Sequence, residues 1–402
     1  MVKIDSCLIS FTRLKRKHFL HLRAATEVHW DVWRKGNENL QFHVLLSILP
    51  IIPNFRLLSL YNVSINEAQQ ATIFGLSTLR TLVVQYCRFH PSTNSIPHSH
   101  MTALKLTRND MQTSRHLLSA FASTVEDLEV DPSHRTASCF LLGGLIELPK
   151  VSTFTTTNWP EVADSRASFG IFKRYTSITT LHILFHLSLS DMSLHHLDLP
   201  ALRSLTCHRQ LAVGLIPKRP VATYVEVDCH LEEGPWRLFD SFSETRVGIT
   251  NLKLFIPANF CSLLPSFATS LQHLEQLTLG LRFPKEVYLS PNQLSRQPLH
   301  NPGVGAVMLP KLRWMTVCVE DYRYTSFSLE WLLKECFMPV SLVLEEFECL
   351  YFAVPSYLFQ LYQLPEPTLA WKVRRLPDGS WERQGSPPIP IPTPARTFRA
   401  AP

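Results

Sequence analysis

Apolar residues recur along the chain in a short pattern in which the second and third apolar positions are two residues apart. Residues at this spacing point to the same face of a β-strand, so each copy predicts a short strand with one buried face. The clear copies are Phe55/Leu58/Leu60, Leu79/Leu82/Val84, Met101/Leu104/Leu106, Val125/Leu128/Val130, Ile178/Leu181/Ile183, Leu202/Leu205/Cys207, Ala222/Val225/Val227, Ile249/Leu252/Leu254, Leu274/Leu277/Leu279 and Leu312/Met315/Val317. Weaker copies are Ala25/Val28/Trp30, Val151/Phe154/Thr156 and Leu344/Phe347/Cys349.

The segments between these copies have features of short helices. Ser64 and Glu67 have the spacing of a capping box ahead of AQQATIFGL. Asn109 and Asp110 precede apolar residues at helical spacing, as expected at a helix start. Further apolar stripes occupy residues 260–271 and 329–336, and Pro235 suits the first turn of a helix over WRLFDSF. The chain is therefore expected to alternate short strands with short helices.

The interval between copies distinguishes the candidate architectures. Most intervals fall near roughly 20–30 residues, the range of leucine-rich repeats. About a dozen copies exceed the eight units of a barrel, and the alternating strands differ from the doubly apolar strands of a doubly wound sheet. We predict an α/β fold, an irregular leucine-rich-repeat solenoid or horseshoe with parallel strands on the concave face and short helices on the convex face.

Two copies resemble the leucine-rich-repeat form L-x-x-L-x-L-x-x-N/C, namely LRTLVVQYC and MTALKLTRN. The resemblance places Cys87 and Asn109 at the loop-bonding position, which Ser133, His186 and Gln210 occupy in other copies. The phrases LPALRSLTC, LQHLEQLTL and LPKLRWMTV resemble fungal F-box-type leucine-rich-repeat proteins, over most of residues 20–385.

That family resemblance implies a solenoid that captures a substrate and an N-terminal F-box that links it to a ubiquitin ligase through a Skp1-type adaptor. An LP-x-E start followed by an apolar helical run of about 40 residues is not found, and the first copy already lies near Trp30. The sequence leaves two alternatives open: the F-box is missing from this chain, or this member never had one.

Changes in composition predict the domain organisation. Residues 1–24 form an N-terminal basic segment, and residues 25–364 form the repeats with an inserted loop near 281–308. Residues 365–385 are predicted to form a C-terminal capping hairpin around a turn at 377–379. Residues 386–402 form a proline-rich tail of disordered or polyproline-like character.

Composition narrows the class of protein. The chain has 402 residues, of which 45% are hydrophobic and 18% charged, with a formal net charge of +6. This charge is too dispersed to favour nucleic-acid binding. The basic run at residues 13–17 fits a nuclear-targeting signal or, as the favoured alternative, a solvated helix face. Nine Cys without a Cys-x-x-Cys pair, no apolar leader and no run of 18 apolar residues favour a reducing compartment, cytoplasmic or nuclear, without membrane insertion.

No catalytic motif is apparent, so we expect neither an enzyme nor a cofactor. His98 and His100, with His90 nearby, have imidazoles at ligand spacing, but matching Cys or carboxylate ligands are absent around them. An exposed polar loop is the favoured interpretation over a zinc site, and no metal is expected.

Outward strand positions are the better candidates for function, because they would line the concave face. They are Thr81, Gln85, Lys105, Asp127, Glu129, Asp131, Thr153, Thr155, His182, His208, Glu226, Asp228, Lys253 and Phe255. An acidic, hydroxyl-rich middle suits a basic or polar peptide of a protein substrate and repels phosphate. The alternative is a solvated strand face without a ligand. The leading hypothesis is a non-enzymatic protein-binding module related to the substrate-recognition subunits of SCF-type ubiquitin ligases. The alternative is a stand-alone scaffold, or a truncated product, with no ligase link.

Overall fold

The computed structural model of the chain has a mixed α/β fold. The described residues are 2–5, 27–31, 38–90, 100–131, 146–156, 176–183, 199–217, 221, 224–228, 236–245, 248–257, 270–282, 309–320, 343–352 and 368–384. They form mostly parallel strands and a few short helices, which confirms the predicted α/β class with a parallel sheet. The chain divides into two compact units, Met1–Leu215 (unit 1) and Ile216–Pro402 (unit 2).

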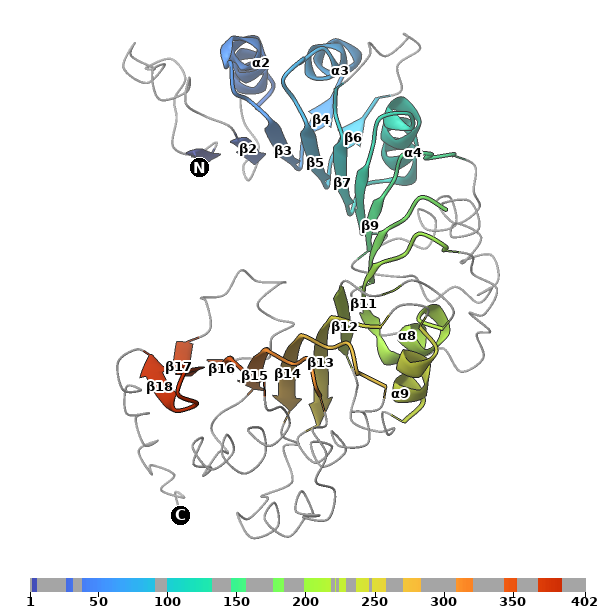
Figure 1. Cartoon of the computed structure of the whole chain (residues 1–402). Helices are drawn as coiled ribbons and strands as arrows, with labels where there is room; N and C mark the ends of the chain where they lie inside the picture. Colours follow the sequence, from blue (N-terminus) through green and yellow to red (C-terminus); the bar gives the residue numbers. More distant parts are fainter. Residues whose placement is uncertain are drawn as a thin grey trace, which may run out of the picture. The chain divides into compact units, whose positions relative to one another are not determined.

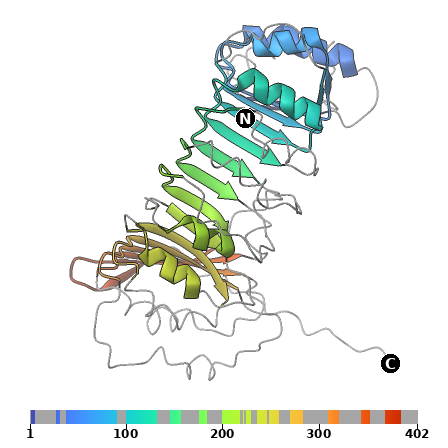
Figure 2. The same cartoon turned by 90° about the vertical axis from the view of Figure 1, so that its right-hand side faces the viewer.

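Unit 1 is built on a parallel sheet whose strand order follows the chain (Figure 1). Its strands are β1 (Val2–Asp5), β2 (Glu27–Asp31), β3 (Leu57–Tyr61), β5 (Thr81–Gln85), β7 (Ala103–Thr107), β8 (Asp127–Asp131), β9 (Thr153–Thr156), β10 (Thr180–Ile183) and β11 (Ser204–His208). Two short strands, β4 (Ser64–Ile65) and β6 (Arg88–Phe89), pair in a second parallel sheet. The strands drawn from blue to green run side by side in Figure 2.

The apolar pattern accounts for this sheet. Leu58 pairs with Leu82, Leu82 with Leu104, and Leu104 with Leu128, so the same position of each copy meets its equivalent on the next strand. All four side chains are completely buried. Burial of such a side chain contributes about 1.5–3 kcal/mol to the stability of the folded chain. One repeat cannot bury these side chains alone, so the core is completed only when neighbouring repeats stack. The prediction that the apolar copies lie on neighbouring parallel strands is confirmed for the described copies of unit 1.

The interval between paired residues is short. From β3 to β11 it ranges from 22 residues, between Leu82 and Leu104, to 27 residues, between Phe154 and Leu181. Such an interval has room for a strand, two turns and at most a short helix, because a full βαβ crossover needs about 30 residues or more.

The helices of unit 1 are α2 (Glu38–Ile48), continued by the 3-10 turn η2 (Leu49–Ile51), α3 (Glu67–Phe74), α4 (Met111–Phe121) and α8 (Arg209–Leu215). Figure 1 shows α2, α3 and α4 on one face of the unit 1 sheet. The buried side chains of α3 and α4, such as Phe74 and Phe121, pack edge to face with ring centroids 4.8 Å apart. The predicted helix after Asp110 is confirmed, and the Asp110 carboxylate accepts a hydrogen bond from the Thr113 N–H at 2.6 Å.

The predicted capping box of α3 was placed two residues too early. Asn66 is the N-cap, and its Oδ1 accepts from the Gln69 N–H at 3.0 Å while the Asn66 N–H donates to Gln69 Oε1 at 2.9 Å. Ser64 lies in β4 instead, and its hydroxyl contacts His90 Nε2 at 3.2 Å. Ser64 therefore belongs to the short strand ahead of the helix, and the helix begins after Asn66.

Unit 2 continues the pattern with longer strands. β12 (Tyr224–Asp228), β13 (Asn251–Pro257), β14 (Gln276–Arg282), β15 (Trp314–Glu320) and β16 (Glu346–Phe352) are parallel, and α9 (Trp236–Ser243) lies between β12 and β13 in the chain. The interval between paired residues ranges from 25 residues, between Leu252 and Leu277, to 38 residues, between Leu277 and Met315. The paired residues Leu252, Leu277 and Met315 are buried, as the apolar pattern predicts.

An antiparallel hairpin ends the described part of unit 2. β17 (Thr368–Arg375) pairs with β16, and β18 (Trp381–Gln384) pairs with β17. Gly379 has a φ of 84°, and the Leu376 N–H donates to the Ser380 carbonyl at 2.8 Å, which closes the turn. The hairpin lies in the segment 365–385, and its capping role stays a prediction.

Several sequence predictions fall outside the described residues. They are the basic run at 13–17, most of the helix over 260–271, the helix over 329–336, the inserted loop beyond residue 282 and the tail at 386–402. Within the described residues, no helix has the length and apolarity needed to span a bilayer.

Candidate functional site

The outward strand positions of unit 1 align across the sheet. We call the following residues the outward face of unit 1. The first row is Leu57, Thr81, Ala103, Asp127, Thr153, Thr180 and Ser204; the middle row is Ser59, Val83, Lys105, Glu129, Thr155, His182 and Thr206; the last row is Tyr61, Gln85, Thr107 and Asp131. These side chains are partly exposed, apart from the buried Thr206, and none of the helices labelled α2, α3 and α4 lies over them (Figure 1).

Most of the predicted site residues of unit 1 are brought together on this face. Nine of them are half-buried members of its three rows: Thr81, Gln85, Lys105, Asp127, Glu129, Asp131, Thr153, Thr155 and His182. His208 differs, because its side chain is buried. We expected solvent contact there, but β11 is buried at every position from Leu205 to His208. Alternation along that strand therefore does not mark an exposed face.

The predicted acidity of this face is largely offset by basic neighbours. Lys105 Nζ lies 2.7 Å from Glu129 Oε2, and Arg108 Nε lies 3.9 Å from Asp131 Oδ2. The Asp127 carboxylate has no ion pair within the described part of the chain, and partial burial raises its pKa, although the charge of Lys105 opposes that shift. Two of the three carboxylates of the predicted acidic patch are therefore ion-paired, and its preference for a basic peptide stays a prediction.

Within these two ion pairs, the cation is more exposed than the carboxylate. Arg108 is 51% exposed and its partner Asp131 only 9%, while Lys105 is 40% exposed and Glu129 27%. In both pairs the cation is the more accessible partner, so the outward face presents Lys105 and Arg108 to a ligand. Arg88 lies outside this face on β6, where it is 72% exposed and 3.5 Å from Asp110.

A repeated turn at the ends of β3, β5 and β7 brings three further residues into line. Asn62, Tyr86 and Arg108 each follow a strand and have φ values of 55°, 54° and 53°. The Asn62 N–H donates to the Gln85 carbonyl at 2.9 Å, and the Tyr86 N–H donates to the Thr107 carbonyl at 3.1 Å. The left-handed turn thus places one side chain per repeat at the same edge of the outward face.

Tyr61, Tyr86 and Arg108 pack against one another at that edge, and we call them the Tyr–Arg cluster. The rings of Tyr61 and Tyr86 meet edge to face with centroids 5.3 Å apart. The Arg108 guanidinium lies 5.5 Å from the centroid of the Tyr86 ring, and its Nη1 donates to the Tyr86 hydroxyl. This hydrogen bond raises the pKa of Arg108 above its usual value. Tyr86 is 39% exposed, so part of its ring is open to a ligand.

The sequence pattern contains the signal for this cluster, although outward strand positions alone did not reveal it. In LRTLVVQYC and MTALKLTRN, the residue just before the loop-bonding Cys or Asn is Tyr86 or Arg108. A left-handed turn at that position turns the side chain away from the core.

No protein-family model matches this chain, and no curated protein is significantly similar to it. The geometry of the described residues therefore carries the functional argument.

The predicted residues of unit 2 form a smaller set. Lys253 Nζ lies 2.8 Å from Glu226 Oε1 and 5.1 Å from the centroid of the Phe255 ring. Phe255 is buried rather than outward in solvent, because its ring covers Gly280 on the next strand. The side chain of Asp228 lies outside the described residues.

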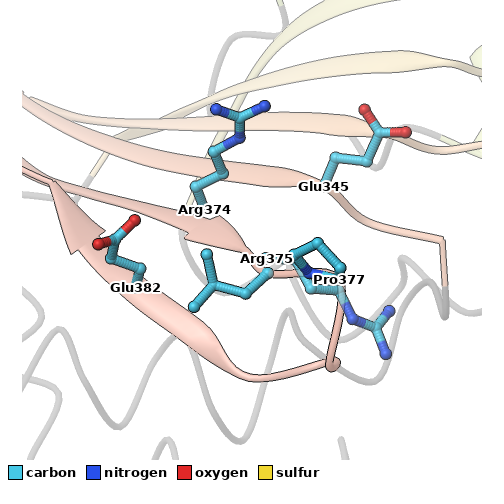
Figure 3. Close-up of a pocket in the computed structure, with 6 residues that line it drawn as sticks. Glu345, Arg374, Arg375, Pro377 and Glu382 are labelled. Carbon is cyan, nitrogen blue, oxygen red and sulfur yellow. The ribbon is translucent and has the colours of Figure 1, made fainter.

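A hollow of about 480 Å³ lies beside the β17–β18 turn of unit 2 (Figure 3). It is lined by Glu345, Arg374, Arg375, Leu376, Pro377 and Glu382. Arg313 binds the Glu345 carboxylate at 2.8 and 3.0 Å, and the remaining charged side chains spread around the rim without a common centre (Figure 3). This arrangement lacks the converging titratable groups of a catalytic site.

The histidines near residue 98 have the sequence spacing of metal ligands. The described residues contain no group of three or more His, Cys, Asp or Glu side chains placed to hold a metal ion. His98 itself lies outside the described residues, while His90 contacts the hydroxyl of Ser64.

Proposed function

We propose that this chain is a non-enzymatic protein-binding module, built as an irregular leucine-rich-repeat solenoid whose outward face binds a segment of a partner protein. The regular register from β3 to β11 supports the solenoid, because equivalent residues of successive copies pair in order. The side chains of Cys87 and Asn109 support it too, since each bonds the preceding turn, as the repeat pattern implies.

The observation that carries the binding function is the outward face of unit 1. Its charged and polar side chains stand in rows on paired strands, and neighbouring strands of a sheet lie about 4.8 Å apart. A peptide laid across these strands would meet one new side chain per strand. Because the strands hold these groups in fixed positions, the entropic cost of ordering them on binding is low.

The ubiquitin-ligase link is the more specific part of the proposal. It is supported by the phrases LPALRSLTC, LQHLEQLTL and LPKLRWMTV, which resemble F-box-type repeat proteins. In that role the chain would present a substrate to the ligase through a Skp1-type adaptor. Co-purification of the adaptor with the full-length gene product tests the link. Partner capture without the adaptor would instead favour a stand-alone scaffold.

We also propose that the protein resides in the cytoplasm or nucleus. Cys87 is a buried free thiol rather than a disulfide partner, which suits a reducing compartment. Localisation of a tagged chain in its source cell tests this placement.

A pull-down from the source cell tests the binding function. We would compare wild type with Thr155→Arg, which places a long side chain in the middle row, and with the control Ser119→Arg on the exposed side of α4. Partners quantified by mass spectrometry should be depleted severalfold by Thr155→Arg and retained by Ser119→Arg. Equal recovery with both variants would contradict binding at the outward face.

A further inference from the structure

We propose that the Tyr–Arg cluster of Tyr61, Tyr86 and Arg108 anchors a partner segment in which a carboxylate stands next to an apolar side chain. This inference rests on the proposed protein-binding function. It names the point at which recognition is concentrated and the chemistry of the ligand.

The backbone supplies the first argument. Left-handed φ values cost a non-glycine residue energy, and Asn is the type that tolerates them best. Asn62 fills this position in one repeat, whereas Tyr86 and Arg108 fill it in the next two. The backbone of the turn therefore does not require a large aromatic side chain or a guanidinium at this position. Strained residues of this kind cluster at functional sites.

The residue types supply the second argument. Tyr and Arg are over-represented among the side chains that dominate protein–protein binding energy. Tyr86 is exposed but held in place by the edge of Tyr61 and by the hydrogen bond from Arg108. A partner's apolar side chain could cover the exposed part of Tyr86 at little entropic cost, because the ring is already fixed.

The charge of Arg108 indicates that the ligand carries a carboxylate. Arg108 is half exposed, and its only ion pair within the described residues is the single 3.9 Å contact with the nearly covered Asp131. A guanidinium has five N–H donors, so several remain for a ligand, and its planar fork suits a carboxylate. Lys105, also more exposed than its acidic partner, lies on β7, which Arg108 follows, and is a second cation near the cluster.

Selection of peptides on the full chain is the direct test. The probe is a library of short random peptides displayed on phage and selected against immobilised wild-type protein. Enriched peptides should carry Asp or Glu beside an apolar residue. Their affinity should fall by about tenfold or more with Arg108→Asn or Tyr86→Asn, the size of loss expected at a binding hot spot. The matched control is Arg88→Gln, an exposed and ion-paired arginine outside the cluster, which should leave affinity unchanged.

The same variants separate a binding role from a structural one. Asn relieves the left-handed strain at both positions, so Tyr86→Asn and Arg108→Asn should leave the thermal midpoint unchanged or raised while binding is lost. A lowered midpoint together with lost binding would mean a structural role and would overturn the proposal. Arg108→Lys, which keeps the charge but not the fork, should show an intermediate loss of affinity.

A double-mutant cycle tests the direct contact between Arg108 and the carboxylate of the peptide. Changing the peptide's Glu to Gln should weaken binding to wild type but have little further effect on Arg108→Gln. The anchor is wrong if no peptide is enriched, if the enriched peptides are basic, or if the two changes are additive. Some peptides could lose affinity for the Thr155→Arg variant but bind the Tyr86→Asn variant normally. That result would overturn the Tyr–Arg cluster as the anchor and leave the binding function of the outward face intact.

Discussion

The side chain of Asn109 closes the turn that follows the preceding strand, at Cys87. Its Oδ1 accepts a hydrogen bond from the Cys87 N–H at 2.9 Å, and its Nδ2 donates to the Val84 carbonyl at 2.7 Å. Cys87 has the same role one repeat earlier, where its Sγ accepts from the Val63 N–H and donates to the Leu60 carbonyl, each at 3.4 Å. In these two repeats, the side chain thus satisfies buried backbone groups of the preceding repeat.

Asn109→Ala should destabilise the chain by about 2–4 kcal/mol, because it leaves a buried N–H and a buried carbonyl without partners. Urea denaturation followed by circular dichroism measures the loss. The control is Thr107→Ala, a half-exposed outward position on the same strand. A loss no larger than that of the control would show that the Asn109 bonds do not hold the turns together.

Gly280→Ala tests the packing of unit 2. A Cβ at Gly280 would come within 2.1 Å of Phe255 Cδ1, so the buried ring would have to move. Overpacking of this kind costs about 1–3 kcal/mol. Thr278→Ala on the same strand is the control, and Phe255→Leu should relieve part of the cost in the double variant. Additive losses in the double variant would exclude direct contact as the cause.

Burial raises the pKa of the Cys87 thiol to about 11. The thiol is the unreactive form, so native Cys87 should resist alkylation between pH 7 and 9 and react only after unfolding. Peptide mass spectrometry after iodoacetamide treatment, with and without urea, measures this directly. Rapid labelling of Cys87 in the absence of urea would contradict its buried role in the turn.

His116 should make stability depend on pH. Burial lowers its pKa below the ordinary value of 6.5, and its Nε2 lies 2.8 Å from Gln70 Oε1. The unfolded chain therefore binds a proton more readily than the folded chain. The His116 contribution is full above pH 6.5 and is lost as the pH falls below it.

The pH effect is measured as the difference in unfolding free energy between pH 7.5 and pH 5.5. His116→Gln should reduce this difference, whereas His43→Gln, at an exposed position on α2, should not. An unchanged difference in the His116 variant would remove this residue as a source of acid sensitivity.

The strands were predictable because their signal is local and repeated. The copy Leu79/Leu82/Val84, for example, is buried throughout and pairs in register on both sides. Helix α2 was missed, although Phe42, Leu45, Leu46 and Leu49 are buried at helical spacing. The apolar residues of this segment are so close together in the sequence that they also fit a short strand. Only tertiary packing distinguishes the helix from a strand here.

The candidate site was predictable in position but not in charge. Period-two alternation placed Lys105 and Glu129 on the outward face. Their ion pair depends on the register between β7 and β8, which the pattern of a single strand does not give. The relative exposure of Arg108 and Asp131 likewise depends on the turn after β7, which the strand pattern does not describe. Burial of His208 depends on what covers the second face of β11, which alternation cannot reveal.

The most direct test of the account is site-specific photo-crosslinking in the source cell, with the photoreactive residue placed at Thr155 or at Ser119. Thr155 lies on the outward face, and Ser119 lies on the exposed side of α4. If the outward face binds a partner protein, a discrete crosslinked species should form from Thr155 and be absent from Ser119. Crosslinks from Ser119 alone, or the same species from both positions, would contradict binding at the outward face.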